Sequence, residues 1–375
     1  MPSMQAESAV AGVREPPAAP RAETAPAQRF LPLDAFRGLI MILLVSDGLG
    51  FRALVEDPRY HAIAVQFDHV PWIGAVFYDL IAPAFLFMVG MSMLFSLGRR
   101  SQQGATFRQN LRHVTMRCLR LMLLSQILIS IEANRLHFQM HNILTHIAVA
   151  YLLCYLIMQL RFSWQVASAI ALLAVHSSLF FLFPGPDGAF TKTGNIGAVI
   201  DRTLMGYNYE SWTTNLNVIS TTVTALFGVW AGNLLRSARP RAAQLKILAI
   251  AMAGAFASGL ALSPWIPIIR RIWTASFALY SAGWVLLMFL VLYLVIDVAG
   301  YRKWAFPLTV AGSNAIFIYS FDIILRGWLN QSVAVFTRNF AAFGALAPVA
   351  QSCAVLFVMW CLCYWLHRHK VFLRL

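Results

Sequence analysis

The stretch from Gln66 to Gly90, QFDHVPWIGAVFYDLIAPAFLFMVG, places a carboxylate and a proline inside an apolar segment. If a helix starts near Pro71, Asp79 lies about eight residues, or roughly 12 Å, along its axis. An ionisable side chain at that depth in a membrane costs about 2.5–3.5 kcal/mol, so we expect Asp79 to face protein or a wet cavity. Pro83 cannot donate a hydrogen bond to the carbonyl of Asp79, which predicts a helix that is locally opened beside its charge.

The composition of the whole chain is that of a polytopic membrane protein. Of its 375 residues 59% are hydrophobic and only 12% are charged, with a mean hydropathy of +0.66, whereas soluble domains carry about 25% charged residues. Apolar segments of spanning length predict an all-α fold of about ten transmembrane helices. They lie at about 36–55, 73–97, 114–132, 142–160, 164–184, 214–235, 244–263, 272–298, 305–325 and 345–366.

The N-terminal residues have a different composition. Residues 1–28 are rich in Ala, Pro and Glu and contain no apolar run. We therefore expect a disordered cytoplasmic tail at 1–28, followed by one multi-pass membrane domain at 29–375.

The net charge of +14 would suggest a nucleic-acid partner in a soluble protein. A topological explanation accounts for it here, because cytoplasmic loops of membrane proteins collect Lys and Arg. With the N-terminus inside, 20 of the 29 Lys and Arg residues fall on the cytoplasmic side. This orientation puts His69 and the loop 185–212 on the outer side, and we expect no nucleic-acid partner.

The cysteines and the known ligand motifs indicate no metal site. All five cysteines lie in or beside apolar segments, and neither a CxxC pair nor a Cys/His cluster occurs. We interpret them as small apolar residues that form no disulfide and bind no metal.

The first apolar segment opens with a charged pair in Leu33–Gly38, LDAFRG. We expect Asp34 to cap the N-terminus of the helix, and Arg37, three residues later, to pair with it. A structural role alone would explain this pair. An arginine at the cytoplasmic mouth is also the residue type that holds a phosphate through a forked contact, so both roles stay open.

His69 lies in a predicted loop at the outer surface, next to Asp68 and ten residues before Asp79. A lone exposed histidine usually has no catalytic role, but a carboxylate within reach changes its chemistry. The histidine can then accept a proton near neutral pH while the carboxylate fixes its tautomer. Asp68 and Asp79 are both candidates for this orienting role.

Several of these stretches together resemble the heparan-alpha-glucosaminide N-acetyltransferase family and its bacterial relatives. The most specific part is H-x-x-W-x-G at His69–Gly74, followed by D-L-x-x-P-x-F-x-F-x-x-G at Asp79–Gly90. The other similar runs are Leu33–Gly38, Phe227–Gly232, Arg271–Phe277 and Gly312–Ile316. The resemblance covers nearly everything after residue 29.

The resemblance implies a membrane acyltransferase that uses cytoplasmic acetyl-CoA and acetylates an amino sugar or hydroxyl of a glycan on the far side. His69 would be the active-site histidine, either as a covalent acyl carrier or as a general base. We expect Asp79 and Asp68 to belong to the catalytic site with it. We expect Arg37, Asp34 and Asn314 to hold the acyl-CoA, its anionic nucleotide being drawn to the basic cytoplasmic mouth.

Two departures from the family pattern bear on the acceptor. Ser46-Asp47-Gly48 stands where many members have Val-Asn, and Thr145-His146-Ile147 stands where Gln-Arg-Ile is common. These differences argue against heparan sulfate as the acceptor. The Arg-rich, Lys-poor composition favours a bacterial inner membrane protein.

The alternative from another functional class is a proton-coupled transporter or flippase of an envelope precursor, because Asp79, Asp322 and His146 could form a proton relay. The inverted repeats common in transporters are not apparent in the sequence. The expected partners are acyl-CoA, the glycan acceptor and membrane lipids. The sequence leaves the oligomeric state open, a homodimer included.

The charge distribution generates a test of orientation. A cysteine introduced at His61 or Asp187 should react with an impermeant thiol reagent added to intact cells, because both positions are expected outside. A cysteine at Gln103 should not react. Labelling at 103 without labelling at 187 would reverse the topology and the placement of His69.

Overall fold

The computed structural model describes residues 30–140, 142–206 and 215–373, so the predicted tail at 1–28 lies outside the described residues. Thirteen α-helices connected by short 3-10 or π turns make up the described chain, and no strand occurs within it. The α-helices are α1 (Leu31–Val45), α2 (His61–Ala64), α3 (Ile81–Gln102), α4 (Phe107–Glu132), α5 (Ile143–Ile157), α6 (Phe162–Leu182), α7 (Ile196–Met205), α8 (Asn217–Arg236), α9 (Arg241–Leu262), α10 (Ala275–Tyr293), α11 (Phe306–Ser313), α12 (Ala315–Thr337) and α13 (Ala347–Arg368). The short turns are η1 (Gly48–Leu54), η2 (Val65–Phe67), η3 (Phe77–Leu80), η4 (Leu294–Val298), η5 (Lys303–Ala305) and η6 (Arg338–Leu346).

The all-α polytopic fold is confirmed, but the count of ten spans is not. Among the described residues seven helices are long and apolar enough to cross a membrane, or eight if the pair 303–313 and 315–337, bent by 64°, is one span. The predicted spans at 36–55 and 142–160 correspond to α1 and α5, which have 15 residues each. Such a helix is only about 22 Å long, shorter than the roughly 30 Å hydrocarbon core of a bilayer.

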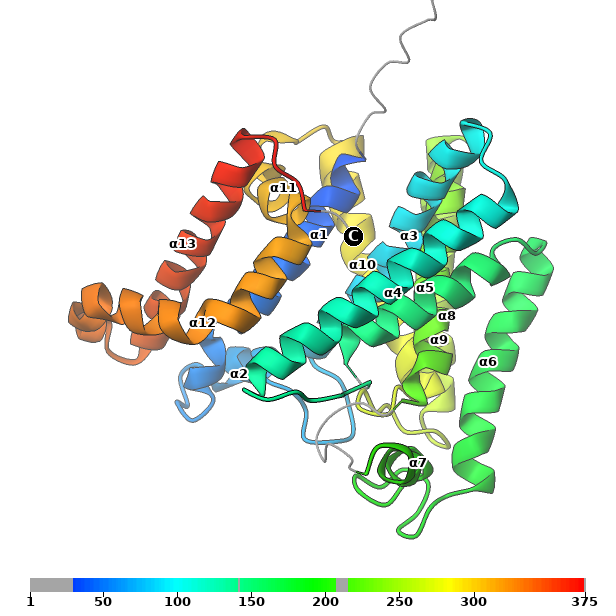
Figure 1. Ribbon diagram of the computed structural model, residues 1–375, viewed down its shortest axis with the longest axis horizontal. Helices are drawn as coiled ribbons and strands as arrows, with labels where there is room; N and C mark the ends of the chain where they lie inside the picture. The colour runs from blue at the N-terminus through cyan, green and yellow to red at the C-terminus, as the bar shows by residue number, and fades with distance from the viewer. Residues whose placement is uncertain (1–29, 141, 207–214, 374–375) are drawn as a thin grey trace, which may run out of the picture. The chain divides into compact units, whose positions relative to one another are not determined.

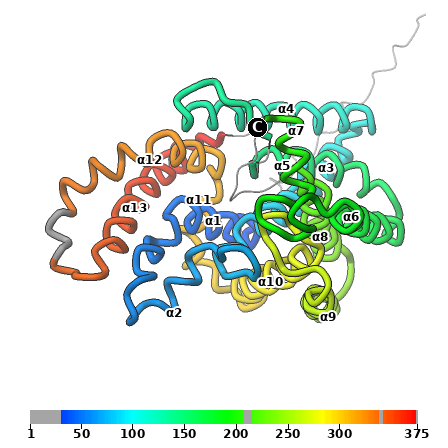
Figure 2. Tube along the Cα trace, turned by 90° about the horizontal axis from the view of Figure 1, so that it is seen from below, coloured from blue at the N-terminus to red at the C-terminus, as the bar shows by residue number. Residues whose placement is uncertain are grey.

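Helices α1, α3 and α10 meet in a fully buried aromatic cluster. Phe36, Phe87 and Phe289 contribute one ring each, with centroids 5.5–6.4 Å apart. Figure 1 shows α12 and α13 on one side of this centre and α6 and α9 on the other. The view from below in Figure 2 likewise places α1 and α10 between the α12–α13 pair and α6.

The two ends of the helical domain carry different elements. Figure 1 shows the beginning of α1 and the connection from α3 to α4 at one end, and the short helices α2 and α7 at the other. Arg99 and Arg100 close α3 at the first end. His69, which follows α2, belongs to the second.

Helix α3 starts later than predicted, and this changes the position of its carboxylate. Gly74 has φ +109° and donates its N–H to Ile268 O at 2.7 Å, while Val76 is extended. The helix therefore begins only at Phe77, as the 3-10 turn η3, and Asp79 lies in its first turn rather than eight residues inside. The expectation of a deep intrahelical charge was wrong. A carboxylate in the first turn instead meets the free N–H groups and the positive end of the helix dipole.

The start of α1 also differs from the prediction. The helix begins at Leu31, so Asp34 lies inside its first turn and is not the N-cap. The expected pair with Arg37 is present: Arg37 Nη1 donates to Asp34 Oδ1 at 3.2 Å.

Helices α3 and α8 pack closely through glycines. A methyl group at Gly228 would collide with the carbonyl oxygen of Phe87, and one at Gly90 with that of Ala225. The absence of side chains at these two positions lets the helix backbones touch. Since η3 leads directly into α3, this contact also fixes the helix that carries Asp79.

We expect Gly228→Ala to separate α3 from α8 and to lower the free energy of unfolding by about 1–3 kcal/mol through overpacking. The measurement is the thermal unfolding midpoint in detergent. The matched control is Gly254→Ala on the exposed face of α9, where no atom lies within 4 Å of the added methyl group. That change should be neutral or stabilising by up to about 1 kcal/mol. Equal midpoints for the two variants would contradict the close contact.

Candidate active site

The centre of the candidate site is a hydrogen bond between a loop histidine and a buried carboxylate. His69 Nδ1 lies 2.7 Å from Asp79 Oδ1, and the Asp79 side chain is 1% exposed. The other oxygen, Asp79 Oδ2, accepts the backbone N–H groups of Val76 at 3.2 Å and Val70 at 3.5 Å. Asp79 thus binds both ends of the loop that carries the histidine.

This contact determines which ring nitrogen is available for chemistry. An ionised Asp79 only accepts hydrogen bonds, so Nδ1 of His69 must carry the proton and Nε2 keeps its lone pair. The ring is partly exposed, at 19%. Burial lowers the pKa of His69 below its usual 6.5 and outweighs the hydrogen bond that the ring donates to Asp79, which raises this pKa; the charge of Arg270 lowers it further. At pH 7 the ring is a neutral base.

Asp68 has a different role in the same loop. One of its oxygens, Oδ1, accepts the backbone N–H of His69 at 2.8 Å and lies 3.0 Å from Nε of Arg52. Of the two carboxylates left open by the sequence, Asp79 contacts the imidazole and Asp68 contacts the backbone. Asp68 therefore positions the loop rather than the ring.

Arg270 is the third member of the site, and the sequence analysis missed it. Its Nε lies 3.5 Å from Asp79 Oδ1, and the residue is 9% exposed. Burial lowers the pKa of Arg270 to about 10, so the guanidinium stays charged at pH 7. The signal in the sequence is the adjacent pair Arg270–Arg271, in a segment that the charge distribution predicts to lie outside, where few cations are expected.

A tyrosine borders the histidine on the side of α1 and contacts a third carboxylate. The rings of Tyr78 and His69 are 4.9 Å apart, and the Tyr78 hydroxyl donates to Asp47 Oδ1 at 3.3 Å. Asp47 follows the end of α1 and has φ +49°. The Ser46-Asp47-Gly48 departure from the family pattern thus lies beside the candidate site.

The residues predicted to hold acyl-CoA lie elsewhere. Arg37 donates to Asp34 and, through Nη2, to Ser92 Oγ at 2.8 Å, so it joins α1 to α3. Asn314 is fully buried; its side chain donates to Val371 O and accepts from Leu373 N, both at 3.1 Å. Asn314 thus anchors the C-terminal segment. These contacts are structural, and the binding of acyl-CoA by Asp34, Arg37 and Asn314 stays a prediction.

The geometry predicts a pH dependence that is specific to His69. Diethyl pyrocarbonate modifies neutral imidazole, so its reaction with His69, followed by mass spectrometry of the peptide, should be half-maximal below pH 6.5 because burial lowers the pKa. The bond from Asp79 raises this pKa, so Asp79→Asn should move the midpoint to still lower pH. A wild-type midpoint above 6.5, or an upward shift in the variant, would contradict the buried neutral ring.

Comparison with known proteins identifies the family of the chain. The family model described as heparan-alpha-glucosaminide N-acetyltransferase, catalytic, matches residues 29–253, which include His69 and Asp79 but not Arg270. The mouse heparan-alpha-glucosaminide N-acetyltransferase is 23% identical over 380 residues, covering 82% of this chain and 55% of the relative. The human protein of the same name is 24% identical over 358 residues, covering 78% and 52%. The chain spans about half the length of these curated relatives. It belongs to the heparan-alpha-glucosaminide N-acetyltransferase catalytic family.

Proposed function

We propose that this protein is a membrane acetyltransferase. It moves an acetyl group from cytoplasmic acetyl-CoA to an amino group or hydroxyl of a glycan on the opposite side of the membrane. The observation that carries this proposal is the 2.7 Å contact between His69 Nδ1 and Asp79 Oδ1, which leaves Nε2 as the basic nitrogen of a partly exposed side chain. Family membership supports the acetyl group as the one transferred.

The chemistry follows from the free ring nitrogen. The acceptor nitrogen or oxygen attacks the thioester carbonyl carbon while Nε2 of His69 takes its proton. The tetrahedral intermediate then collapses, the C–S bond breaks, and the leaving thiolate of CoA takes the proton from the imidazolium. In the covalent alternative Nε2 itself attacks first, and the C–S bond breaks to release the CoA thiolate. The acceptor then attacks the acetyl-imidazole, the C–N bond to Nε2 breaks, and the proton of the acceptor passes to the thiolate. Asp79 stabilises the positive charge of the ring in either route.

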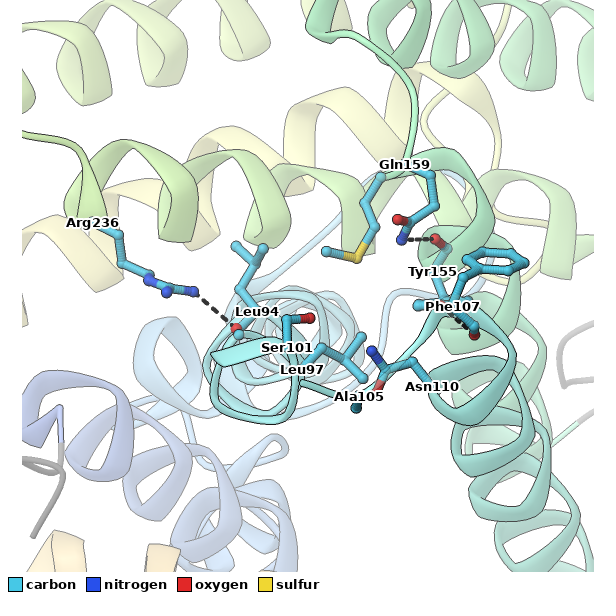
Figure 3. A pocket seen from close by; sticks show the side chains of 11 residues that line it. Leu94, Leu97, Ser101, Ala105, Phe107, Asn110, Tyr155, Gln159 and Arg236 are labelled. Carbon is cyan, nitrogen blue, oxygen red and sulfur yellow. Dashed lines mark hydrogen bonds between the residues drawn. The ribbon is translucent and has the colours of Figure 1, made fainter. Parts of the chain in front are cut away.

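The donor would bind at the opposite end of the helical domain, which carries the basic residues. A cavity of about 250 Å³ lies there between α3, α4, α5 and α8 (Figure 3). Arg236, Asn110 and Gln159 give it polar walls, and Phe107 and Tyr155 stack at one side with centroids 5.7 Å apart. Arg37 contacts the same helix, α3, at Ser92. A polar cavity with a cation and an aromatic pair suits an anionic nucleotide.

Because the basic end of the helical domain and the end with His69 are far apart, the acetyl group would have to enter the domain to reach the histidine. From Arg37 to Asp47, where Tyr78 binds, α1 and its end extend ten residues, or roughly 15 Å in helical geometry. A nucleotide held near Arg37 would leave a pantetheine arm to extend along α1 toward His69. The proposal includes a cytoplasmic N-terminus and a location in the bacterial inner membrane.

The test separates donor binding from transfer. Purified protein in nanodiscs should bind acetyl-CoA, with an affinity that falls as salt rises because the nucleotide carries several negative charges. His69→Ala should keep this binding within about twofold and lower transfer to glucosamine about 10²–10⁴-fold, the usual effect of losing a general base.

The matched control is His61→Ala, an exposed histidine of α2 whose Nδ1 lies 2.7 Å from the backbone oxygen of Val55. It should transfer at the wild-type rate. Transfer by His69→Ala at the wild-type rate would remove the histidine from the mechanism. Failure to bind several acyl-CoA species at low salt would favour the transporter alternative.

A further inference from the structure

Arg270 has hydrogen-bonding capacity that the described protein does not use. Its Nε and Nη1 are buried, and neither makes a hydrogen bond with a described residue. Buried side-chain donors are nearly always satisfied, so an unused donor on a charged group calls for an explanation. The contact with Asp79 is an ion pair at 3.5 Å through Nε, not a forked pair of short bonds. Nη1 is therefore left for a ligand.

The backbone on both sides of Arg270 is fixed relative to the loop that carries His69. Ile269 forms a bridge with Gly74, in the loop between His69 and Asp79. On the other side, Trp273 has φ +47° and its indole N–H donates to Thr224 Oγ1 at 3.2 Å. A donor fixed in this way needs little rearrangement when a charge develops next to it, which is the condition for electrostatic catalysis.

We propose that Arg270 is a catalytic residue that donates through Nη1 to the carbonyl oxygen of the acetyl group while that oxygen becomes negative. The inference rests on the proposed acetyl transfer. It adds an anion site to the base supplied by His69. Both residues contact the same oxygen of Asp79, at 2.7 Å and 3.5 Å, so the carboxylate places the base and the cation together.

The role follows from the electron balance of the transfer. When the acceptor lone pair forms the new bond to carbon, the two π electrons of the carbonyl move onto oxygen. They return when the C–S bond breaks and its electron pair leaves with the CoA sulfur. The oxyanion exists in both the direct and the covalent route, so Arg270 is needed whichever role His69 has. A guanidinium that is largely buried stabilises that charge strongly.

The competing explanation is that Arg270 serves only as the counter-ion of Asp79. A double-mutant cycle distinguishes the two. Arg270→Gln alone should lower kcat about 10²–10³-fold, the usual loss for one oxyanion donor, with donor binding changed less than about threefold. In the Asp79→Asn background the same change should still lower kcat by about tenfold or more. If it has no further effect there, Arg270 acts only through Asp79 and the proposal is overturned.

The double variant also shows whether a loss of activity in Arg270→Gln comes only from destabilised folding. Arg270→Gln alone leaves Asp79 buried without its cationic partner, which destabilises proteins. The double variant Asp79→Asn with Arg270→Gln removes both charges together. Arg59→Gln is the matched control for charge, since Arg59 is exposed on the same side and pairs with Asp57 at 2.7 Å. It should leave kcat unchanged.

A spectroscopic measurement gives a readout that does not need turnover. With acetyl-CoA labelled with 13C at the thioester carbonyl, infrared difference spectra should show the stretching frequency lowered on binding to wild type. His69→Ala should keep the lowered frequency, and Arg270→Gln should return it toward the value in solution. The same frequency in wild type and Arg270→Gln would contradict the contact. Absence of acetyl-CoA binding would instead contradict the proposed function.

Discussion

The site depends on one buried carboxylate. Asp79 accepts hydrogen bonds from two backbone N–H groups of its own loop and from the imidazole of His69. It also forms an ion pair with Arg270. An ionised group with 1% exposure is tolerable only when it is compensated in this way, because removing any one partner leaves desolvated charge. The conformation of the loop, the tautomer of the histidine and the position of the arginine therefore follow from the same requirement.

Helix packing fixes the position of Asp79 relative to these partners. The 3-10 turn with Asp79 leads into α3, and α3 contacts α8 through glycine and α1 and α10 through the phenylalanine cluster. The carboxylate is consequently attached to the most buried part of the domain, while the histidine lies in a loop. In such a site the loop with the histidine can move to admit a substrate while the buried carboxylate stays in place.

The sequence was sufficient for the fold class and for the expectation that a carboxylate lies within reach of His69, because hydropathy and a charge beside an apolar run are local signals. It could not choose between Asp68 and Asp79, since the direction of a ring depends on tertiary contacts. Arg270 was missed because its partner lies almost 200 positions earlier in the chain. The start of α3 was misplaced because the pairing of Gly74 with Ile268 is not visible in a hydropathy profile. Two spans were overextended at their C-terminal ends, because hydropathy does not mark where α1 gives way to the 3-10 turn η1 or where α5 ends at Ile157.

The bridge between Gly74 and Ile269 has a consequence for how the site can change. It joins the histidine loop and the arginine loop into one unit, although they arise from opposite halves of the chain. An insertion in either loop would shift His69 and Arg270 together, and so alter the candidate site as a whole. Changes that alter one side of the site alone would have to come from elements outside the bridged unit, such as the segment at the end of α1 that presents Asp47 to Tyr78.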